Sequence, residues 1–255
     1  MTLDLTGQLT LVTGGASGIG ATVARRFAAL GAHVLVTDLN DTEGAKVASE
    51  IGGDYHHLDV SDAAAWDALV GPRDAFDIVF LNAGVTTRRH DQAPDDRLLS
   101  EITDSAYRRI MGANVDGVVF GTRAVMPQMV ERGRGHIVIT ASMAGLGAVP
   151  FDPIYALTKH AVVGFAKSLG LVAGPHGVCT SAICPGFADT NIMTAESKAL
   201  LGMAGVAIMS PERVADTVVT AILANNPGSV WAVWGDLPIT QYQPAPPFEG
   251  LLTTR

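Results

Sequence analysis

Near its amino terminus the sequence reads Leu9-Thr10-Leu11-Val12-Thr13, followed directly by Gly14-Gly15-Ala16-Ser17-Gly18-Ile19-Gly20. The first five residues are apolar and β-prone, which predicts a short buried strand. After the glycines, apolar residues recur with the spacing of an amphipathic helix at Ile19, Val23, Phe27 and Leu30. A strand, a glycine turn and a helix start together form a cradle that attracts a pyrophosphate. The same residues also fit a tight turn without a ligand, so the rest of the sequence is needed to distinguish a pyrophosphate site from an ordinary turn.

Strand-like and helix-like segments alternate along the rest of the chain. The further strands are expected at His33–Asp38, Tyr55–Asp59, Phe76–Leu81, His136–Thr140, Val178–Ile183 and Val230–Trp234. The further helices are expected at Asp41–Ile51, at Ala63–Leu69, from the cap Thr103 through Asn114 to about Glu131, from Pro153 to about Ala173, and from the cap Ser210 to about Leu223. This alternation predicts an α/β fold, a Rossmann-like doubly wound parallel sheet of about seven strands with helices on both faces.

A length of 255 residues suits one large domain or two small ones. No repeat, linker or shift in composition divides the chain, so residues 1–255 are expected to form a single dinucleotide-binding and catalytic domain. Residues 235–255 are rich in proline, which predicts an extended tail.

The formal net charge of −8 disfavours nucleic acid and anionic membrane surfaces as partners. Only 16% of the residues are charged and 48% are hydrophobic, so we expect apolar surface to be buried in a homo-oligomer, either a dimer or a tetramer. There is no signal-peptide pattern and no apolar run of membrane-spanning length. We therefore expect a cytoplasmic protein with no membrane partner.

The two cysteines, Cys179 and Cys184, fall in one predicted strand. Residues five positions apart in a strand point to opposite faces, so these two cannot form a disulfide with each other there. They are expected to be buried thiols in a reducing compartment. No spacing of cysteine and histidine suggests a metal site, and none is expected.

Asp38 ends the second predicted strand, about 20 residues after the glycine turn, where an acid that binds a ribose is expected. Its carboxylate can accept hydrogen bonds from both hydroxyls of the adenosine ribose, and it would repel a 2′-phosphate. The neighbouring Ala16, Ser17 and Leu39 are uncharged. The sequence therefore predicts NAD rather than NADP as the cofactor.

Ser142, Tyr155 and Lys159 form a second constellation. Tyr155 and Lys159 are four residues apart in a predicted helix and so share one face. A nearby ammonium favours the phenolate and is expected to lower the tyrosine pKa. Ser142 follows a predicted strand, and ligands gather at the carboxyl ends of parallel strands. Taken alone, a Tyr and a Lys at this spacing are more often an ordinary pair on a helix surface.

In order along the chain stand Thr13-Gly14, Gly18-Ile19-Gly20, Asn82-Ala83-Gly84, Asn114, Ser142, Tyr155 with Lys159, and Pro185-Gly186. In this order and at these separations the motifs resemble those of the short-chain dehydrogenase/reductase family. The resemblance covers nearly all of residues 5–235. Each motif is weak alone, but the set is specific.

The resemblance implies a role for each matching residue. Tyr155 would be the catalytic acid/base, and Lys159 would lower its pKa and hold the nicotinamide ribose. Ser142 would position the substrate oxygen. Asn114 would keep a water for proton relay.

The resemblance also implies a set of cofactor-binding residues, which Tyr155 and Lys159 complete. Gly14, Ser17, Gly18, Ile19 and Gly20 would form the cradle, with Asp38 at the ribose. Asp59 and Val60 would lie beside the adenine; Asn82, Ala83 and Gly84 beside the adenosine ribose; Pro185, Gly186, Ala188 and Thr190 beside the nicotinamide. Ala188 stands where the family often has Val or Ile, but that position contacts the cofactor through its backbone. The chain lacks the Asp-Gly-Gly ending of tetrameric members.

The substrate pocket is expected to be apolar and to take a medium-sized secondary alcohol or ketone. Its walls would come from three segments, residues 143–152, 85–103 and 187–209. The residues expected to contact the substrate are Ser142, Met143, Val149, Tyr155, Phe187, Ile192 and Met193. Several of these could equally be core or interface residues.

The sequence thus favours an NAD-dependent oxidoreductase that interconverts a secondary alcohol and a ketone. Two alternatives remain open: an epimerase or dehydratase that uses bound NAD and a similar Tyr/Lys pair, and a non-catalytic NAD-binding module. The first usually has a longer substrate domain. The second would not explain Asn114, Ser142, Tyr155 and Lys159 together.

Overall fold

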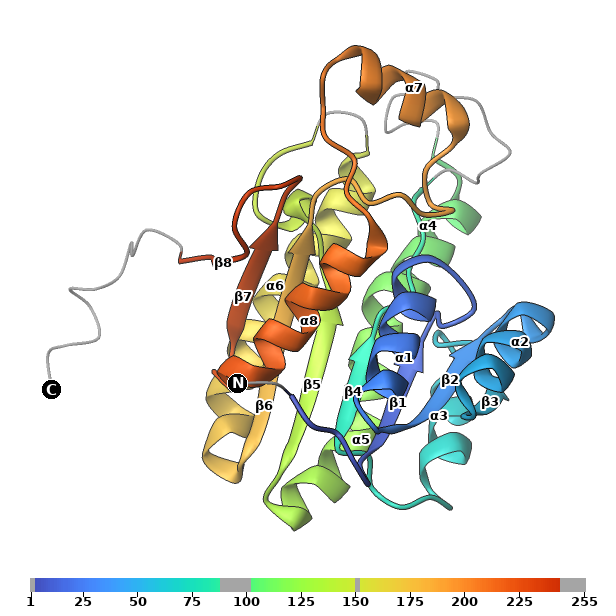
Figure 1. The fold of residues 1–255 in the computed structure, drawn as a ribbon, viewed down its shortest axis with the longest axis vertical. Coiled ribbons are helices and arrows are strands. Elements are labelled where there is room, and N and C mark those ends of the chain that lie inside the picture. Colours follow the sequence, from blue (N-terminus) through green and yellow to red (C-terminus); the bar gives the residue numbers. More distant parts are fainter. Residues whose placement is uncertain (1–2, 88–101, 150–151, 244–255) are drawn as a thin grey trace, which may run out of the picture.

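The structure, a computed structural model, describes residues 3–87, 102–149 and 152–243. Its centre is one sheet with the strand order β3-β2-β1-β4-β5-β6-β7-β8 (Figure 1). The first seven strands are parallel: β1 Leu9–Thr13, β2 His33–Asp38, β3 Asp54–His57, β4 Ile78–Leu81, β5 Gly135–Thr140, β6 Val178–Pro185 and β7 Ser229–Val233. The last, β8 (Thr240–Gln241), is antiparallel to β7.

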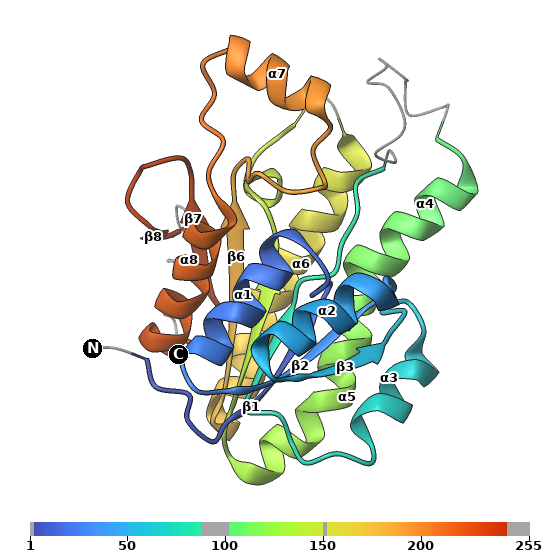
Figure 2. The same cartoon turned by 45° about the vertical axis from the view of Figure 1, so that its right-hand side comes forward.

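Helices cover both faces of the sheet, so the predicted doubly wound α/β fold is confirmed (Figure 2). Buried side chains of α1 (Gly18–Ala29), α2 (Asp41–Ile51) and α8 (Pro211–Ala224) share one hydrophobic cluster with one face of the sheet. Those of α3 (Ala63–Val70), α5 (Gly117–Arg132) and α6 (Pro153–Ala173) share the cluster on the other face. Successive side chains of a strand point to opposite faces, as Leu11 and Val12 of β1 do, so the core has two layers.

The strand order reverses between β1 and β4, which are neighbours in the sheet. The chain first builds outward from β1 to β2 and β3, then crosses back to β4 and builds in the opposite direction. At such a switch point the connections leave the sheet in opposite directions, and a crevice opens beyond the carboxyl ends of the strands. The predicted glycine turn follows β1, and Asn82 follows β4, so both lie at this crevice.

The structure differs from the prediction in the long helix expected from Thr103 to about Glu131. Here α4 (Asp104–Met111) and α5 are joined by a π-helical turn, η2 (Gly112–Asp116). Asn114 lies in this turn and is 1% exposed. A π turn inserts extra backbone into a helix and often occurs at functional sites. Hydrophobic periodicity cannot reveal it, because both flanking helices keep the normal repeat.

Two elements in the carboxyl-terminal third were not predicted. The helix α7 (Ala195–Met203) has no buried residue and lies above the carboxyl ends of the strands (Figure 2). The strand β8 falls inside the tail that was expected to be extended, where Thr240 and Gln241 pair with β7. Residues 244–255 of that tail lie outside the described residues, as do residues 88–101 of the predicted substrate loop.

A chain of buried polar side chains crosses three strands. His136 Nε2 on β5 lies 3.0 Å from Ser181 Oγ on β6, which lies 3.1 Å from Ser229 Oγ on β7. The indole N–H of Trp231 donates to the same Ser229 oxygen at 2.9 Å. His136 is 5% exposed, and burial lowers its pKa from 6.5 to about 4. The hydrogen bonds satisfy an imidazole that the core keeps neutral.

His136 is expected to make the stability of the fold depend on pH. The unfolded chain binds a proton at this residue near pH 6.5, but the folded chain does so only near pH 4. The free energy of unfolding should therefore fall by about 3 kcal/mol as the pH is lowered through this range, and the contribution should be fully present above it. Urea denaturation between pH 4 and 7.5 should give a smaller pH dependence for His136→Gln than for the unchanged protein. The exposed His33 provides the control His33→Gln; equal slopes for the two variants would contradict the prediction.

Candidate functional site

The glycine turn after β1 brings backbone segments closer together than any side chain would allow. Gly14 has φ +63°, and a Cβ there would lie 2.9 Å from the Cα of Ala83. A Cβ on Gly20, at the start of α1, would lie 2.0 Å from the carbonyl oxygen of Gly14. The turn therefore folds tightly on itself and against the segment after β4. Ile19 packs into the core below, while Ser17 precedes α1 and makes no side-chain capping bond.

The side-chain amide of Asn82 connects this turn to the centre of the sheet. Its Nδ2 donates to the carbonyls of Thr13, at 3.1 Å, and Gly14, at 3.3 Å. Its Oδ1 accepts the hydroxyl of Thr140, at 3.1 Å. The backbone N–H groups of Asn82 and Ala83 both donate to Thr13 Oγ1. The structure thus brings Asn82, Ala83 and the cradle together, and a Cβ on Gly84 would lie 3.1 Å from Asn114 Oδ1.

Asp38 lies at the end of β2, directly beside the glycine turn. One carboxylate oxygen accepts the N–H of Ala16 at 3.0 Å, and the other accepts the N–H of Asn40 at 3.0 Å. These bonds fix the carboxylate at the edge of the cradle. Of the residues expected beside the adenine, Asp59 accepts both hydrogen bonds of Ser61, and Val60 is buried.

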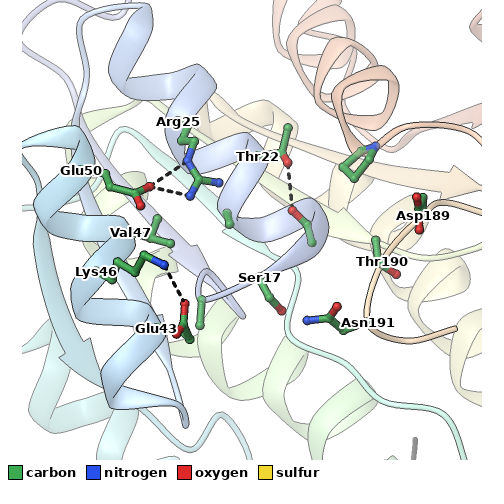
Figure 3. A pocket seen from close by; sticks show the side chains of 14 residues that line it. Ser17, Thr22, Arg25, Glu43, Lys46, Val47, Glu50, Asp189, Thr190 and Asn191 are labelled. Carbon is green, nitrogen blue, oxygen red and sulfur yellow. Dashed lines mark hydrogen bonds and ion pairs between the residues drawn. The ribbon is translucent and has the colours of Figure 1, made fainter. Parts of the chain in front are cut away.

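A cavity of about 300 Å³ adjoins the cradle between α1, α2 and the chain after β6 (Figure 3). Ser17 and Asn191 face each other at its edge. Two cationic side chains, Arg25 and Lys46, also line this cavity. They were missed in the sequence analysis, because only the residues near Asp38 in the sequence and in the glycine turn were considered there. Each has a carboxylate partner, Arg25 with Glu50 at 2.6 Å and Lys46 with Glu43 at 3.7 Å. Helical spacing alone could have indicated the second pair, but not the first, which joins two helices.

The catalytic candidates Ser142, Tyr155 and Lys159 come together at the carboxyl end of β5. Ser142 begins a short 3₁₀ turn, where its hydroxyl accepts the N–H of Ala144 at 3.1 Å. Tyr155 and Lys159 lie in the first two turns of α6, and Lys159 Nζ is 5.6 Å from the centre of the Tyr155 ring. Lys159 is 4% exposed and donates to the carbonyl of Thr140 at 2.8 Å.

The pKa values of this pair differ from the expectation that Lys159 lowers that of Tyr155. Burial raises the pKa of Tyr155 to about 12, with further increases from Asp152 and Cys184, while a hydrogen bond with the Ser142 side chain opposes them. Burial lowers the pKa of Lys159 to about 8. The amine is directed toward the Thr140 carbonyl, so in this structure desolvation outweighs its effect on the phenol.

Asn114 uses its whole side chain to hold neighbouring segments. Its Oδ1 accepts the N–H of Val85 at 2.8 Å, and its Nδ2 donates to the Val85 carbonyl at 2.9 Å. Nδ2 also donates to Thr158 Oγ1, which donates in turn to the carbonyl of Tyr155. The π turn therefore places Asn114 between the segment after β4 and α6.

The segment after β6 returns over the cradle. Pro185 ends β6, and a Cβ on Gly186 would lie 2.5 Å from the Trp234 ring. Phe187 and Asp189 make backbone hydrogen bonds with Met209, and the buried Ala188 lies between them. A Cβ on Gly18 would lie 3.1 Å from Thr190. Of the residues predicted around the nicotinamide, Thr190 thus lies next to the first turn of α1, while Pro185 and Gly186 lie at the carboxyl end of β6.

The residues expected to contact the substrate lie in different environments. Met143 packs against the core, and the Phe187 ring makes an edge contact with Trp234 at 5.7 Å between centroids. Ile192 is 41% exposed, while Val149 and Met193 are partly buried. Met143 and Phe187 thus have packing roles besides any contact with a substrate.

Across residues 3–87, 102–149 and 152–243, no helix is both long and apolar enough to cross a membrane. Within the same ranges, no group of three or more His, Cys, Asp or Glu side chains is arranged to hold a metal ion.

The geometry matches that of a known family. The sequence profile described as short chain dehydrogenase matches residues 8–200, so the chain belongs to that family. A 3-alpha-(or 20-beta)-hydroxysteroid dehydrogenase of Mycobacterium bovis is 37% identical over 192 residues, which are 73% of this chain and 71% of the relative.

Two solved structures are similar over most of their length. A 3-oxoacyl-[acyl-carrier protein] reductase from Brucella melitensis with bound NAD is 29% identical, with a TM-score of 0.79, and covers 92% of this chain and 93% of its own. A gluconate 5-dehydrogenase from Burkholderia cenocepacia in complex with NADP and tartrate is 26% identical, with a TM-score of 0.80, and covers 91% and 96%. The chain is therefore an oxidoreductase of the short-chain dehydrogenase family, and nicotinamide cofactors of both kinds occur among its structural neighbours.

The residues present fit a nicotinamide cofactor. Gly14 and Gly18 leave open a backbone cradle at a helix start, the environment that pyrophosphates prefer. Asp38, Ser142 and Tyr155 lie at the same edge of the sheet. The carboxylate of Asp38 suits a ribose, and the hydroxyls of Ser142 and Tyr155 suit a substrate oxygen.

Gly20→Ala is expected to disrupt the cradle. The new methyl group would collide with the Gly14 carbonyl, so the variant should lose about 1–3 kcal/mol of stability and bind NADH at least about tenfold more weakly. Gly164→Ala is the matched control, because a Cβ there meets nothing within 4 Å inside α6. The control should bind NADH normally and gain up to about 1 kcal/mol from its helix propensity. Denaturant unfolding and the quenching of protein fluorescence by NADH measure both effects; tight binding by Gly20→Ala would refute the assignment.

Proposed function

We propose that the protein is an NAD-dependent dehydrogenase that interconverts a secondary alcohol and a ketone. The observation that carries this proposal is the convergence of Ser142, Tyr155 and Lys159 at the carboxyl end of β5, next to the glycine cradle. Residues 1–255 would serve as one dinucleotide-binding and catalytic domain.

The preference for NAD rests on the fixed carboxylate of Asp38. Its negative charge at the edge of the cradle suits the two ribose hydroxyls and opposes a 2′-phosphate. The cations in the adjoining cavity, Arg25 and Lys46, are already paired with Glu50 and Glu43. They therefore offer little uncompensated positive charge to a phosphate.

The catalytic residues would move one proton while the hydride moves. When bound, the nicotinamide supplies the acceptor or donor of the hydride. In alcohol oxidation the Tyr155 oxygen takes the hydroxyl proton, and in ketone reduction it returns that proton. Ser142 would hold the substrate oxygen by a hydrogen bond. Lys159, whose pKa burial lowers to about 8, would hold the nicotinamide ribose and favour the phenolate when its amine turns away from the Thr140 carbonyl.

The substrate would be a medium-sized apolar alcohol or ketone, and a hydroxysteroid is the class we favour. The hydroxysteroid dehydrogenase relative supports this class. The side chains expected around the substrate, including Val149, Phe187, Ile192 and Met193, are apolar. Substrates of this size and polarity match a pocket that binds mainly by burying apolar surface.

We also propose that the enzyme works in the cytoplasm as a homo-oligomer, a dimer or a tetramer. On α6, Leu157, Leu171 and Val172 are 49%, 80% and 68% exposed, which is a large apolar area for one helix. Burial of that area between subunits would remove it from water.

The two alternative functions have less support. An epimerase or dehydratase would use a Tyr/Lys pair in the same place, but the family match favours alcohol and carbonyl chemistry. A non-catalytic NAD-binding module would not need Ser142 and Lys159 beside Tyr155.

Turnover of secondary alcohols is the direct test. NAD should be reduced on mixing with at least one member of a panel that contains 3- and 20-hydroxysteroids and smaller apolar alcohols. Tyr155→Phe should lower kcat about 10²–10⁴-fold, because the proton acceptor is lost, while the Kd of NADH changes little. The rise in NADH absorbance as NAD is reduced measures turnover. Tight NAD binding without turnover of any alcohol or ketone would support the non-catalytic module instead.

Asp38→Ser should shift the cofactor preference. Removal of the carboxylate is expected to lower kcat/KM for NAD and raise it for NADP, each about tenfold. Adding Glu43→Gln should increase NADP use further, because Lys46 loses its partner in the cavity beside Ser17. Comparable kcat/KM for the two cofactors in the unchanged enzyme would rule out the role assigned to Asp38.

A further inference from the structure

Asp152 joins the start of the catalytic helix to the segment that follows β4. Its Oδ1 accepts the backbone N–H of Tyr155 at 3.0 Å and thereby caps α6. The same carboxylate accepts two hydrogen bonds from Thr87, the hydroxyl on Oδ1 and the backbone N–H on Oδ2 at 3.0 Å. One side chain thus serves three donors on two separate segments.

The segment that Asp152 contacts is itself held firmly from its other side. Arg109 on α4 donates to the carbonyls of Thr86 and Thr87 at 2.9 and 2.8 Å. Asn114 in the π turn pairs with both backbone groups of Val85. Side chains from α4, η2 and the start of α6 therefore fix Val85–Thr87, and Thr87 gives Asp152 a rigid point of attachment.

Capping alone does not explain this arrangement. Other helices of the chain are capped by Asn40, Thr103 and Thr194, each of which accepts an N–H of its own helix. Asp152 does the same through Oδ1, but Oδ2 is directed to Thr87, 65 residues away in the sequence. The second oxygen does not cap the helix. Its contact instead connects the start of α6 to the segment after β4.

We propose that Asp152 is a positioning residue of the catalytic site, which holds the backbone of Tyr155 in a fixed place relative to Thr87. The inference rests on the proposed function, since it concerns the acid/base role of Tyr155. Small displacements of a reacting group lower the rate strongly, because the productive geometry is narrow.

The charge of Asp152 also acts on the tyrosine. The ionisable and polar side chains around the Tyr155 hydroxyl are Ser142, Lys159, Cys184 and Asp152, and Arg109 approaches the far side of Thr87. Asp152 raises the pKa of Tyr155, since a carboxylate nearby disfavours the phenolate. Removing the charge should therefore allow alcohol oxidation at lower pH.

Two substitutions separate the contact from the charge. Asp152→Asn keeps an oxygen that can cap α6, but its amide nitrogen cannot accept the N–H of Thr87. Thr87→Val removes the hydroxyl bond to Oδ1, the oxygen that also accepts the Tyr155 N–H, and it leaves the Thr87 N–H on Oδ2 and the carboxylate charge in place. Asp62→Asn is the matched control, because Asp62 caps α3 through the N–H groups of Ala64 and Ala65, and α3 contributes no residue to the site.

With the best alcohol of the panel, Asp152→Asn and Thr87→Val should each lower kcat about tenfold and leave the Kd of NADH within about twofold. Only Asp152→Asn should move the acid limb of the kcat/KM profile, and it should move to lower pH. Asp62→Asn should change neither. Normal kcat and an unmoved acid limb in Asp152→Asn would overturn the inference even though the enzyme remains a dehydrogenase.

Amide hydrogen exchange provides a readout without turnover. If Thr87 holds Tyr155 through Asp152, Thr87→Val should accelerate exchange at the Tyr155 amide about tenfold, while Asp62→Asn should leave it unchanged. An unchanged Tyr155 amide in Thr87→Val would refute the inference. This measurement remains decisive if the unchanged protein oxidises no alcohol, a result that would count against the proposed function alone, or if Asp152→Asn does not fold.

Discussion

The side-chain amide of Asn82 is the contact on which the arrangement of the site depends. It donates to the carbonyls of Thr13 and Gly14 and accepts the hydroxyl of Thr140. The end of β1 is thereby fixed to the end of β5, across β4. Thr140 also offers its carbonyl to Lys159. This amide therefore links the glycine turn, through Thr140, to the amine of Lys159 on α6.

This contact is possible only because the glycines of the turn carry no side chains. A Cβ at Gly14 would press on Ala83, and one at Gly20 would lie 2.8 Å from the Asn82 amide nitrogen. The same lack of side chains that opens the turn to a pyrophosphate thus also lets the amide reach two carbonyls of the turn. In the function proposed above, binding of the cofactor and the position of α6 would share one steric requirement, so the two could not be changed independently.

Much of the fold could be predicted from the sequence because its signals are local. The strand, glycine turn and helix at residues 9–30 are recognisable from period and residue type, and the same holds for the spacing of Tyr155 and Lys159. The π turn at Asn114 could not be predicted, because the flanking helices keep the normal hydrophobic repeat and the Asn114 side chain bonds Val85, which is distant in sequence. The helix α7, which has no buried residue, lacks the buried face that makes a helix detectable.

The site shows the same division between local and long-range causes. Asp38 was identified from its position after a strand, but the pairing of Arg25 with Glu50 required two helices to be placed side by side. The sequence predicts that Lys159 lowers the pKa of Tyr155, whereas burial raises it in the structure, for a related reason. Four-residue spacing places the ammonium on the correct face, yet burial and the Thr140 carbonyl determine where the amine points and how strongly the phenol is desolvated. Such quantities depend on the whole fold and not on spacing.

The π turn has a consequence for how this region can change during evolution. Because successive helical residues are rotated by about 100°, removing one residue from Gly112–Asp116 would turn α4 relative to α5 by about that angle. Arg109 would then leave the carbonyls of Thr86 and Thr87, even with every side chain retained. An insertion or deletion in this turn would therefore reorient the whole of α4 at once, whereas a substitution acts only through the side chain that it changes. The contacts of Arg109 therefore depend on the number of residues in the turn as well as on their identity.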